Sequence, residues 1–265
     1  MMMTRRAILS LAASIPLRPA SLAEQSATLV LDRVAPDPSV SYLLTEFGTG
    51  REIAARWPRV DDPVPVGSLV KPFTGLAYGE THEFHFPISN CRGEQDHCWL
   101  PQGHGRMDIS SAIAYSCNAY FLGLALDVDT DALAAVVERY GLSRPASDAS
   151  PATYIGLGIS WKISPFAIAR AYSELVARST DPGVREILAG MALSARSGTG
   201  RGVSLGAYAK TGTAPCIHES RQVGDGSVVA LFPAPAPRFN LLVRVHGVPG
   251  ARAAWVCGKM RRALS

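Results

Sequence analysis

A serine and a lysine three residues apart, in the stretch Gly67-Ser68-Leu69-Val70-Lys71-Pro72-Phe73, constrain this chain more than any other feature. On a helix such residues share a face, so the Ser68 hydroxyl and the Lys71 amine are expected within hydrogen-bonding distance. A neutral amine can take the proton of a serine hydroxyl and make it a nucleophile. Gly67 allows a sharp turn into the helix, and Pro72 lacks the N–H that would bond the Ser68 carbonyl. The stretch predicts a nucleophilic serine at an irregular helix N-terminus.

Two later motifs separate this pattern from an ordinary helix start, which S-x-x-K alone also fits. They are Ser116-Cys117-Asn118 and Lys210-Thr211-Gly212-Thr213. The order S-x-x-K, S-x-N, K-T-G resembles the motif set of serine enzymes that react with penicillin. Lysine is scarce, because the whole chain has only Lys71, Lys162, Lys210 and Lys259. Two of these lysines stand in the motifs, where this chemistry uses an amine.

The N-terminus has the pattern of an export signal. Arg5 and Arg6 form its charged region, residues 7–16 its apolar region, and Ser21-Leu22-Ala23 a cleavage site. The arginine pair also fits a twin-arginine signal, and an uncleaved anchor is the alternative. The apolar region is too short to span a bilayer. We expect an export signal over 1–23 and a single catalytic domain over 24–265.

The basic charge of the chain belongs largely to this predicted signal. Residues 1–23 contain three arginines and no acid, so removing them lowers the net charge from +4 to +1. A mature chain with so little charge predicts no nucleic-acid partner. No later apolar stretch is long enough to be transmembrane, so membrane attachment is expected only if the signal stays uncleaved.

A segment rich in histidine and cysteine, residues 80–106, follows the Ser68 helix. An exported protein can form disulfides, and we expect Cys91 and Cys98 to close a short loop packed beside the active site. A zinc site built from these cysteines and the segment's histidines is the alternative, although no standard zinc spacing is present. Cys117 is expected to be a small buried packing residue. The remaining cysteines and the histidines of the segment are Cys216, Cys257, His82, His85, His97 and His104.

Hydrophobic periodicity predicts strands at both ends of the chain and helices in the middle. Strands are expected at 27–33, at 41–55 with a hairpin turn at 48–50, at 205–213, at 228–232 and at 240–245. Helices are expected at 68–78, 109–115, 119–126, 131–140, 166–178, 181–195 and 250–264. Asp108 or Ser110 would cap the second of these helices, and Ser164 followed by Pro165 would begin the fifth. This order predicts an α/β fold of the α+β type.

The resemblance extends beyond the three motifs. The stretches 65–73, 103–105, 116–121 and 210–214 resemble the transpeptidase domain of high-molecular-mass penicillin-binding proteins, over roughly residues 40–260. The turn Gly198-Thr199-Gly200 ahead of the K-T-G strand is also similar to that family. The resemblance implies a five-stranded antiparallel sheet flanked by helices, beside an all-helical lobe, with the active site between them.

The resemblance also implies a role for each motif residue. Ser68 would attack the carbonyl of the penultimate D-alanine of a peptidoglycan stem peptide, with Lys71 as base. The pKa of Lys71 would be lowered by burial and by the nearby Lys210. Ser116 would relay a proton to the departing D-alanine amine, and Asn118 would hold the substrate amide. The terminal carboxylate would be bound by Lys210, Thr211, Gly212 and Thr213. The backbone N–H groups of Ser68 and Thr213 would form an oxyanion hole.

The implied reaction needs no metal and no organic cofactor. Its expected partners are peptidoglycan stem peptides, β-lactams and a separate glycan-polymerising protein, because the family usually adds a second domain that this sequence lacks. The expected location is the periplasm or cell envelope. Two alternatives stay open: a serine β-lactamase, and a non-crosslinking module that binds β-lactams or muropeptides. No E-x-x-x-N stretch that could supply a deacylating acid lies between Asn118 and Lys210. The residues do not distinguish transpeptidation from carboxypeptidation.

Overall fold

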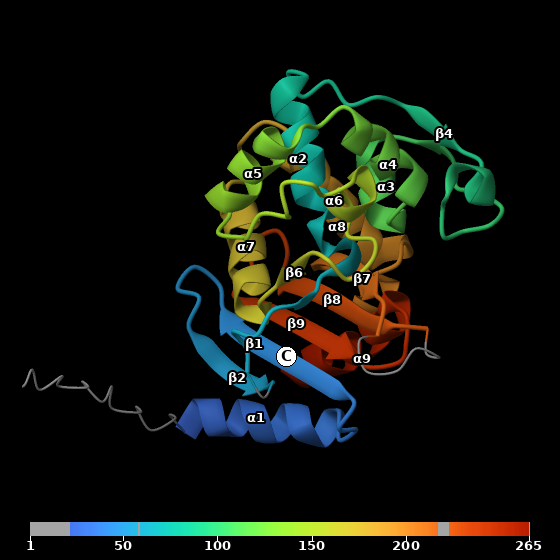
Figure 1. Ribbon diagram of the computed structural model, residues 1–265. Coiled ribbons are helices and arrows are strands. Elements are labelled where there is room, and N and C mark those ends of the chain that lie inside the picture. Colours follow the sequence, from blue (N-terminus) through green and yellow to red (C-terminus); the bar gives the residue numbers. More distant parts are fainter. Residues whose placement is uncertain (1–21, 58, 217–222, 265) are drawn as a thin grey trace, which may run out of the picture.

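A five-stranded antiparallel sheet organises the computed structural model, which describes residues 22–57, 59–216 and 223–264 (Figure 1). The strand order is β2-β1-β9-β8-β7, so the two ends of the chain meet in the middle of the sheet. The strands are β1 Val40–Glu46, β2 Glu52–Arg56, β7 Tyr208–Ala214, β8 Asp225–Phe232 and β9 Phe239–Val245. The expected hairpin at 48–50 and the expected late strands are confirmed. All but the last two residues of the predicted export signal lie outside the described part.

Two helices cover one face of the sheet: α1, Leu22–Val34, and α9, Gly250–Ala263 (Figure 1). The expected strand at 27–33 is therefore wrong, because this segment belongs to α1. Ala27, Leu31 and Val34 recur at helical spacing and join one hydrophobic cluster with the sheet and α9. A short apolar run fits either structure, and here packing under the sheet selects the helix.

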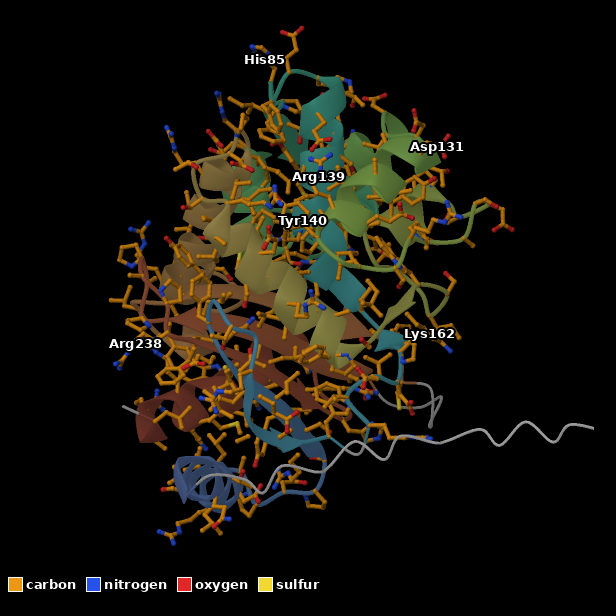
Figure 2. All side chains as sticks on the ribbon, turned by 90° about the vertical axis from the view of Figure 1, so that its left-hand side faces the viewer. His85, Asp131, Arg139, Tyr140, Lys162 and Arg238 are labelled. Carbon is orange, nitrogen blue, oxygen red and sulfur yellow. The ribbon has the colours of Figure 1, made fainter. Side chains whose placement is uncertain are left out.

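The helical lobe stands on the other face and is built around α2, Lys71–Thr81, whose first nine residues are all buried. Around it lie α3 Ile109–Tyr115, α4 Asn118–Leu126, α5 Thr130–Arg139, α6 Pro151–Tyr154, α7 Pro165–Ala177 and α8 Val184–Ser197. Arg139 of α5 pairs with Glu80 of α2, and the ring of Tyr140 lies 5.2 Å from that of Phe73 (Figure 2). The lobe and the sheet confirm the predicted fold class.

Short elements complete the fold and carry the connections near the cleft. Two-stranded sheets pair β3 Val64–Pro65 with β6 Lys162–Ile163 and β4 Ser89–Cys91 with β5 Gly105–Met107. The 3-10 turns are η1 Gly67–Val70, η2 Gly93–Asp96 and η3 Arg201–Val203. Lys162, outside the motifs, lies exposed at the surface (Figure 2).

The predicted helix starts follow the local capping chemistry. The side chain of Asp108 accepts a 2.7 Å hydrogen bond from the N–H of Ser111, and the hydroxyl of Ser164 accepts one of 3.2 Å from Ala167. The helix expected from residue 181 begins later, at Val184, because Gly183 adopts a left-handed conformation with φ of 75°. Within the described part of the chain, no helix is long and apolar enough to cross a membrane.

Candidate active site

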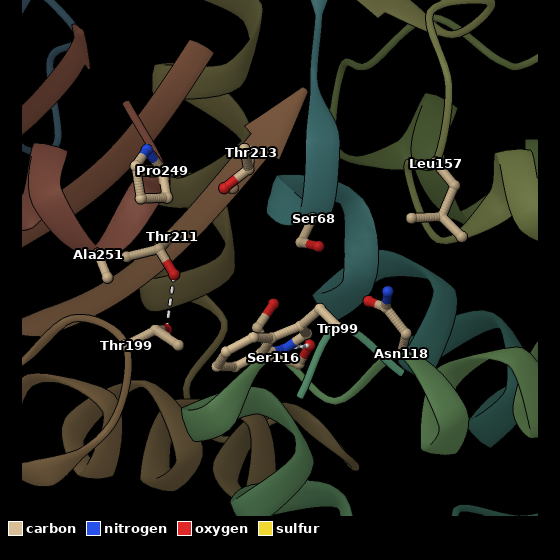
Figure 3. A pocket seen from close by; sticks show the side chains of 11 residues that line it. Ser68, Trp99, Ser116, Asn118, Leu157, Thr199, Thr211, Thr213, Pro249 and Ala251 are labelled. Atoms are coloured by element: carbon tan, nitrogen blue, oxygen red, sulfur yellow. Dashed lines mark hydrogen bonds between the residues drawn. The ribbon is translucent and has the colours of Figure 1, made fainter. Parts of the chain in front are cut away.

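A cleft of about 220 Å³ opens between strand β7 of the sheet and the helical lobe (Figure 3). Six of the eight predicted site residues line it, and Lys71 and Lys210 lie fully buried beside it. The six are Ser68, Ser116, Asn118, Thr211, Gly212 and Thr213. The structure thus brings all three motifs together, although they are far apart in the sequence.

Ser68 reaches the cleft from η1, directly before α2. The Lys71 N–H bonds the Ser68 carbonyl, so the chain enters α2 through a tighter 3-10 turn, as the position of Pro72 predicts. Gly67 has a φ of 55°, and a Cβ there would lie 2.7 Å from the Thr213 carbonyl oxygen. Glycine is therefore required for the turn to approach β7 this closely. The backbones of Ser68 and Thr213 are left on the same side of the cleft.

The ammonium of Lys71 makes different contacts from those expected. Its Nζ donates hydrogen bonds to the carbonyl oxygen of Ser116 at 2.9 Å and to Oδ1 of Asn118 at 2.6 Å. Within the described residues it makes no hydrogen bond to Ser68 Oγ, so the contact expected from the i,i+3 spacing is absent. The 3-10 turn changes the angle between the two side chains, and the S-x-N turn supplies better acceptors. Lys71 therefore joins the two motifs of the helical lobe.

Burial lowers the pKa of Lys71 to about 7, while the nearby thiols of Cys117 and Cys98 act in the opposite direction. Taking an amine out of water penalises its charged form. Burial was one of the two expected causes of a lowered Lys71 pKa, and the nearby Lys210 was the other. Near neutral pH a substantial share of Lys71 is therefore the neutral amine that proton abstraction requires.

Lys210 lies on the opposite side of Ser116 from Lys71 in the network. Its Nζ donates to Ser116 Oγ at 2.9 Å and to the Thr211 carbonyl at 2.8 Å. Burial, and after it the charge of Lys71, lower the pKa of Lys210 well below its usual value. Because Lys210 has 0% exposure, the groups that face a ligand directly are the hydroxyls beside it. The resemblance implied that Lys210 itself binds the terminal carboxylate of the substrate. In the structure its Nζ instead contacts Ser116 and Thr211, and these residues lie between it and the cleft.

The S-x-N turn has the geometry that the sequence suggested. Ser116 ends α3 in a left-handed conformation, with φ of 54°, and Asn118 begins α4. Ser116 and Asn118 face the cleft, whereas Cys117 points away from it with 0% exposure. The burial expected for Cys117 is confirmed.

Three residues that support the site were missed in the sequence. The indole N–H of Trp99 donates to the Ser116 carbonyl at 3.1 Å, and the Tyr172 hydroxyl donates to the Leu69 carbonyl at 2.6 Å. Thr199 Oγ1 accepts a 2.6 Å hydrogen bond from Thr211 Oγ1 (Figure 3). For Thr199, the similarity of the turn 198–200 to the family was an available signal. Trp99 belongs to the segment 80–106, and its place in the cleft confirms that this segment packs beside the site. Nothing in the local sequence pointed to Tyr172.

The expected Cys91–Cys98 disulfide is wrong, because both residues are free thiols. They instead form a cluster with the half-buried His104 and the buried Cys117, and the ligand atoms of all four residues lie within 4.8 Å of one another. The Nδ1 of His104 lies 3.6 Å from Cys91 Sγ and 3.4 Å from Cys98 Sγ, and Cys98 Sγ lies 3.9 Å from Cys117 Sγ. The hairpin of β4 and β5 brings both thiols to His104 and to Cys117 of the S-x-N turn. This arrangement could hold a metal ion, whereas among the described residues His82, His85 and His97 belong to no group of potential metal ligands.

A second group that could contact a metal is Cys216, Asp225 and His246, near the far end of β7. Here the Asp225 carboxylate is already paired with the Arg244 guanidinium and hydrogen-bonded to His246 Nδ1 at 2.8 Å. The bound guanidinium opposes a further cation at this carboxylate. The first cluster is therefore the better metal candidate.

Solved structures of the same architecture are penicillin-binding proteins. Pseudomonas aeruginosa PBP2 in complex with WCK 5153 is 19% identical, with a TM-score of 0.75 over 89% of this chain and 74% of that one. The transpeptidase domain of Burkholderia pseudomallei penicillin-binding protein 3 is 16% identical, with a TM-score of 0.72 over 91% and 93%. Helicobacter pylori PBP2, in its complex with MreC, is 17% identical, with a TM-score of 0.76 over 91% and 62%. At these identities the likeness shows the fold.

The family itself is shown by the sequence match. No curated protein sequence matches the chain. Residues 49–255 match the penicillin-binding protein transpeptidase domain, and they include all three motifs and most of the sheet. The chain belongs to the family of penicillin-binding protein transpeptidase domains.

Proposed function

We propose that this protein is a serine D,D-transpeptidase that acts on peptidoglycan stem peptides through an acyl-enzyme on Ser68. The observation that carries this proposal is the position of the Ser68 hydroxyl, in a cleft whose neighbouring motifs supply two buried amines with lowered pKa values. Such perturbed groups around a nucleophile are typical of catalytic sites.

Acylation would begin with transfer of the Ser68 proton to the neutral Lys71 amine. Ser68 Oγ then bonds the carbonyl carbon of the penultimate D-alanine, and the bond to the terminal D-alanine nitrogen breaks. The backbone N–H groups of Ser68 and Thr213 would stabilise the oxyanion, since Gly67 brings the two segments together. Ser116, fixed by Lys210 at 2.9 Å, would pass the proton to the departing amine. Lys71 would thereby return to its neutral form.

Substrate binding would use the groups that line the cleft. Asn118, oriented by its 2.6 Å hydrogen bond from Lys71, would hold the amide of the acyl donor. The hydroxyls of Ser116, Thr211 and Thr213 would bind the terminal carboxylate, and the buried Lys210 beneath them would add favourable charge when protonated. β-Lactams would acylate Ser68 in the same site. We infer that the protein acts in the cell envelope, where peptidoglycan lies, beside a separate glycan-polymerising protein.

The test is incubation of the protein with a fluorescent penicillin, followed by intact mass over time, with Ser68→Ala beside the wild type. A stoichiometric adduct that lasts for many minutes and is absent from Ser68→Ala supports the proposal. Rapid loss of the adduct while hydrolysed drug accumulates would instead indicate a β-lactamase. If the folded wild type formed no adduct, the catalytic role of Ser68 would have to be abandoned. The alternative of a non-crosslinking module that binds β-lactams or muropeptides would then remain.

We also propose that Cys91, Cys98, His104 and Cys117 hold a zinc ion. The observed separations of 3.4, 3.6 and 3.9 Å are close to the edges of a tetrahedron, which are about 3.6–3.8 Å for zinc with sulfur and nitrogen ligands. Burial lowers the pKa of His104, which favours the neutral ring that binds a metal. The site would be structural, because all four ligand positions come from the protein and Ser68 is not among them.

Zinc binding would be checked by the metal content of the purified protein and by the visible spectrum of its cobalt-substituted form. We expect stoichiometric zinc in the wild type and in Cys257→Ser, which removes a buried thiol outside the cluster, and little zinc in Cys98→Ser. A metal-free wild type whose intact mass is lower by two hydrogens would show a disulfide and would contradict the zinc proposal.

A further inference from the structure

A second hollow, of about 200 Å³, continues the active-site cleft past Thr199. The two share Trp99, Thr199 and Ala251, so a ligand in one can extend into the other. The walls that belong to the second hollow include Tyr115, Arg201 and Trp255. We call the surface formed by Trp99, Tyr115, Arg201 and Trp255 the tryptophan groove.

The groove joins one particular end of the cleft. Asn118 and Leu157 lie at one end of the cleft in Figure 3, and Thr199 and Ala251 lie at the other. The proposed mechanism places the amide of the acyl donor at Asn118 and the departing D-alanine beside Ser116 and Thr211. Because Thr211 Oγ1 donates to Thr199 Oγ1 at 2.6 Å, the groove begins where the leaving group ends.

The incoming amine has to use that same end. Ser116 is held between the two lysines, since its Oγ accepts from Lys210 at 2.9 Å and its carbonyl accepts from Lys71 at 2.9 Å. Because Ser116 is fixed in this way, it can exchange a proton only with an amine nitrogen that lies on its own side of the acyl carbon. The group that protonates the departing amine must therefore also take the proton of the attacking amine. The groove adjoins this position of the nitrogen.

The groove offers both an apolar and a charged surface. Trp99 is 51% exposed and Trp255 is 49% exposed, and such half-exposed aromatic faces favour contact with the aliphatic part of a ligand. Trp99 is held in place by its 3.1 Å hydrogen bond to the Ser116 carbonyl. Arg201 is exposed and forms no ion pair with another described residue, so its guanidinium can bind a carboxylate.

We propose that the tryptophan groove binds the acceptor stem peptide, with its aliphatic amine-bearing side chain along the tryptophans and a carboxylate on Arg201. This inference rests on the proposed function and deepens it. In the step it serves, the acceptor nitrogen forms a bond to the acyl carbon and the bond from that carbon to Ser68 Oγ breaks. One amine proton passes through Ser116 and Lys71 to Ser68 Oγ, so the enzyme returns to its starting state.

The experiment measures partition of the acyl-enzyme between acceptors. The full chain is acylated with a synthetic acyl-D-alanyl thioester and offered free D-alanine or a stem tripeptide that carries a side-chain amine. For Arg201→Gln and Trp255→Ala we expect the KM for the tripeptide to rise about tenfold, as the loss of one good contact would produce. Transfer to D-alanine, hydrolysis by water and labelling by fluorescent penicillin should stay at wild-type rates.

Matched controls lie outside the groove. Arg185→Gln removes an exposed arginine at the start of α8, and Leu126→Ala removes a side chain that is 73% exposed at the end of α4. Neither should change the KM for the tripeptide. Trp99 is left intact because its contact with Ser116 would mix effects on the acceptor with effects on acylation.

Three outcomes would overturn the inference. The first is unchanged tripeptide transfer in both groove variants, and the second is an equal loss of tripeptide transfer and penicillin labelling. The third is a wild type that is acylated but passes the acyl group only to water. The first two outcomes are distinct from failure of the proposed function, because in both the wild type still transfers the acyl group to the tripeptide. The third outcome contradicts transpeptidation itself. A wild type that penicillin does not label would contradict acylation, and the acceptor assay could not begin.

Discussion

The Nζ of Lys210 and the Oγ of Ser116 are joined by a hydrogen bond of 2.9 Å, which links the sheet to the helical lobe across the back of the cleft. Lys210 belongs to strand β7 and Ser116 to the turn between α3 and α4, and both are buried. A serine hydroxyl that accepts this bond keeps its own proton available for donation. The contact therefore sets the direction in which Ser116 can relay a proton.

Loss of this relay should slow acylation without unfolding the protein. Ser116→Ala removes the hydroxyl and leaves the Thr211 carbonyl as acceptor for Lys210, so we expect acylation by penicillin to slow about 100-fold or more. Stopped-flow fluorescence measures the rate, and a thermal melt checks the fold. Ser179→Ala, at an exposed position outside the cleft, is the control. A Ser116→Ala rate within a factor of two of wild type would remove Ser116 from the mechanism.

The rate of acylation should depend on the protonation of Lys71. Because burial lowers the pKa of Lys71 to about 7, the amine is mostly protonated below that pH and mostly neutral above it. Only the neutral form can accept the Ser68 proton, so we expect the acylation rate to rise with pH through an apparent pKa near 7 and then level off. A profile of the second-order rate constant measures this. A rate that still climbs tenfold per unit at pH 9 would show that Lys71 keeps its ordinary pKa.

The turn before Ser68 should tolerate no side chain. In Gly67→Ala the new Cβ would lie 2.7–2.9 Å from backbone atoms of Thr213. The alanine would also have to adopt the positive φ of 55° that glycine has there. The conformation alone costs about 1–2 kcal/mol, and the clash would push η1 away from β7. We expect a lower melting temperature and strongly reduced acylation.

Gly158→Ala is the matched control for this change. Gly158 has a φ of 82°, but a Cβ there would meet nothing within 4 Å. The Gly158→Ala variant should therefore be less stable, because alanine disfavours a positive φ, while its acylation rate stays near that of the wild type. If both variants acylated at the same rate, close approach of Gly67 to Thr213 would not be needed for catalysis.

Metal removal should destabilise the fold if the thiol cluster binds zinc. An ion present at 100 times its Kd stabilises the folded state by about 2.7 kcal/mol, and chelation removes that contribution. We expect a chelator to lower the melting temperature of the wild type, zinc to restore it, and Cys98→Ser to show neither response. Calorimetry with and without chelator measures the difference. An identical melt in both conditions would argue against a structural metal.

Elements with strong local signals were predicted well from the sequence. The capping residues Asp108 and Ser164 and the hairpin at 48–50 specify their own geometry through nearby backbone groups, and all three are confirmed. The segment 27–33 was assigned wrongly because a short apolar run satisfies either a strand or a helix. Its conformation depends on what it packs against, and that surface is made by the nearby strands β1 and β2 together with α9 at the other end of the chain.

The site shows the same division. The chain order of S-x-x-K, S-x-N and K-T-G was enough to name Ser68, Lys71, Ser116, Asn118 and Lys210 and to predict the family, because the chemistry requires those residue types. The partners of those residues were not predictable. Lys71 bonds Asn118 instead of Ser68, and Cys91 faces His104 instead of forming a disulfide with Cys98.

The sequence by itself therefore determined which groups could react, the local helix starts, and the kind of sheet and lobe that carry them. Only the tertiary structure decided which atoms meet: two buried amines on either side of Ser116, four atoms behind it that could bind a metal ion, and a groove beyond Thr199. The physical reason is distance along the chain. Contacts between residues far apart in sequence depend on how whole helices and strands pack, which no local pattern encodes.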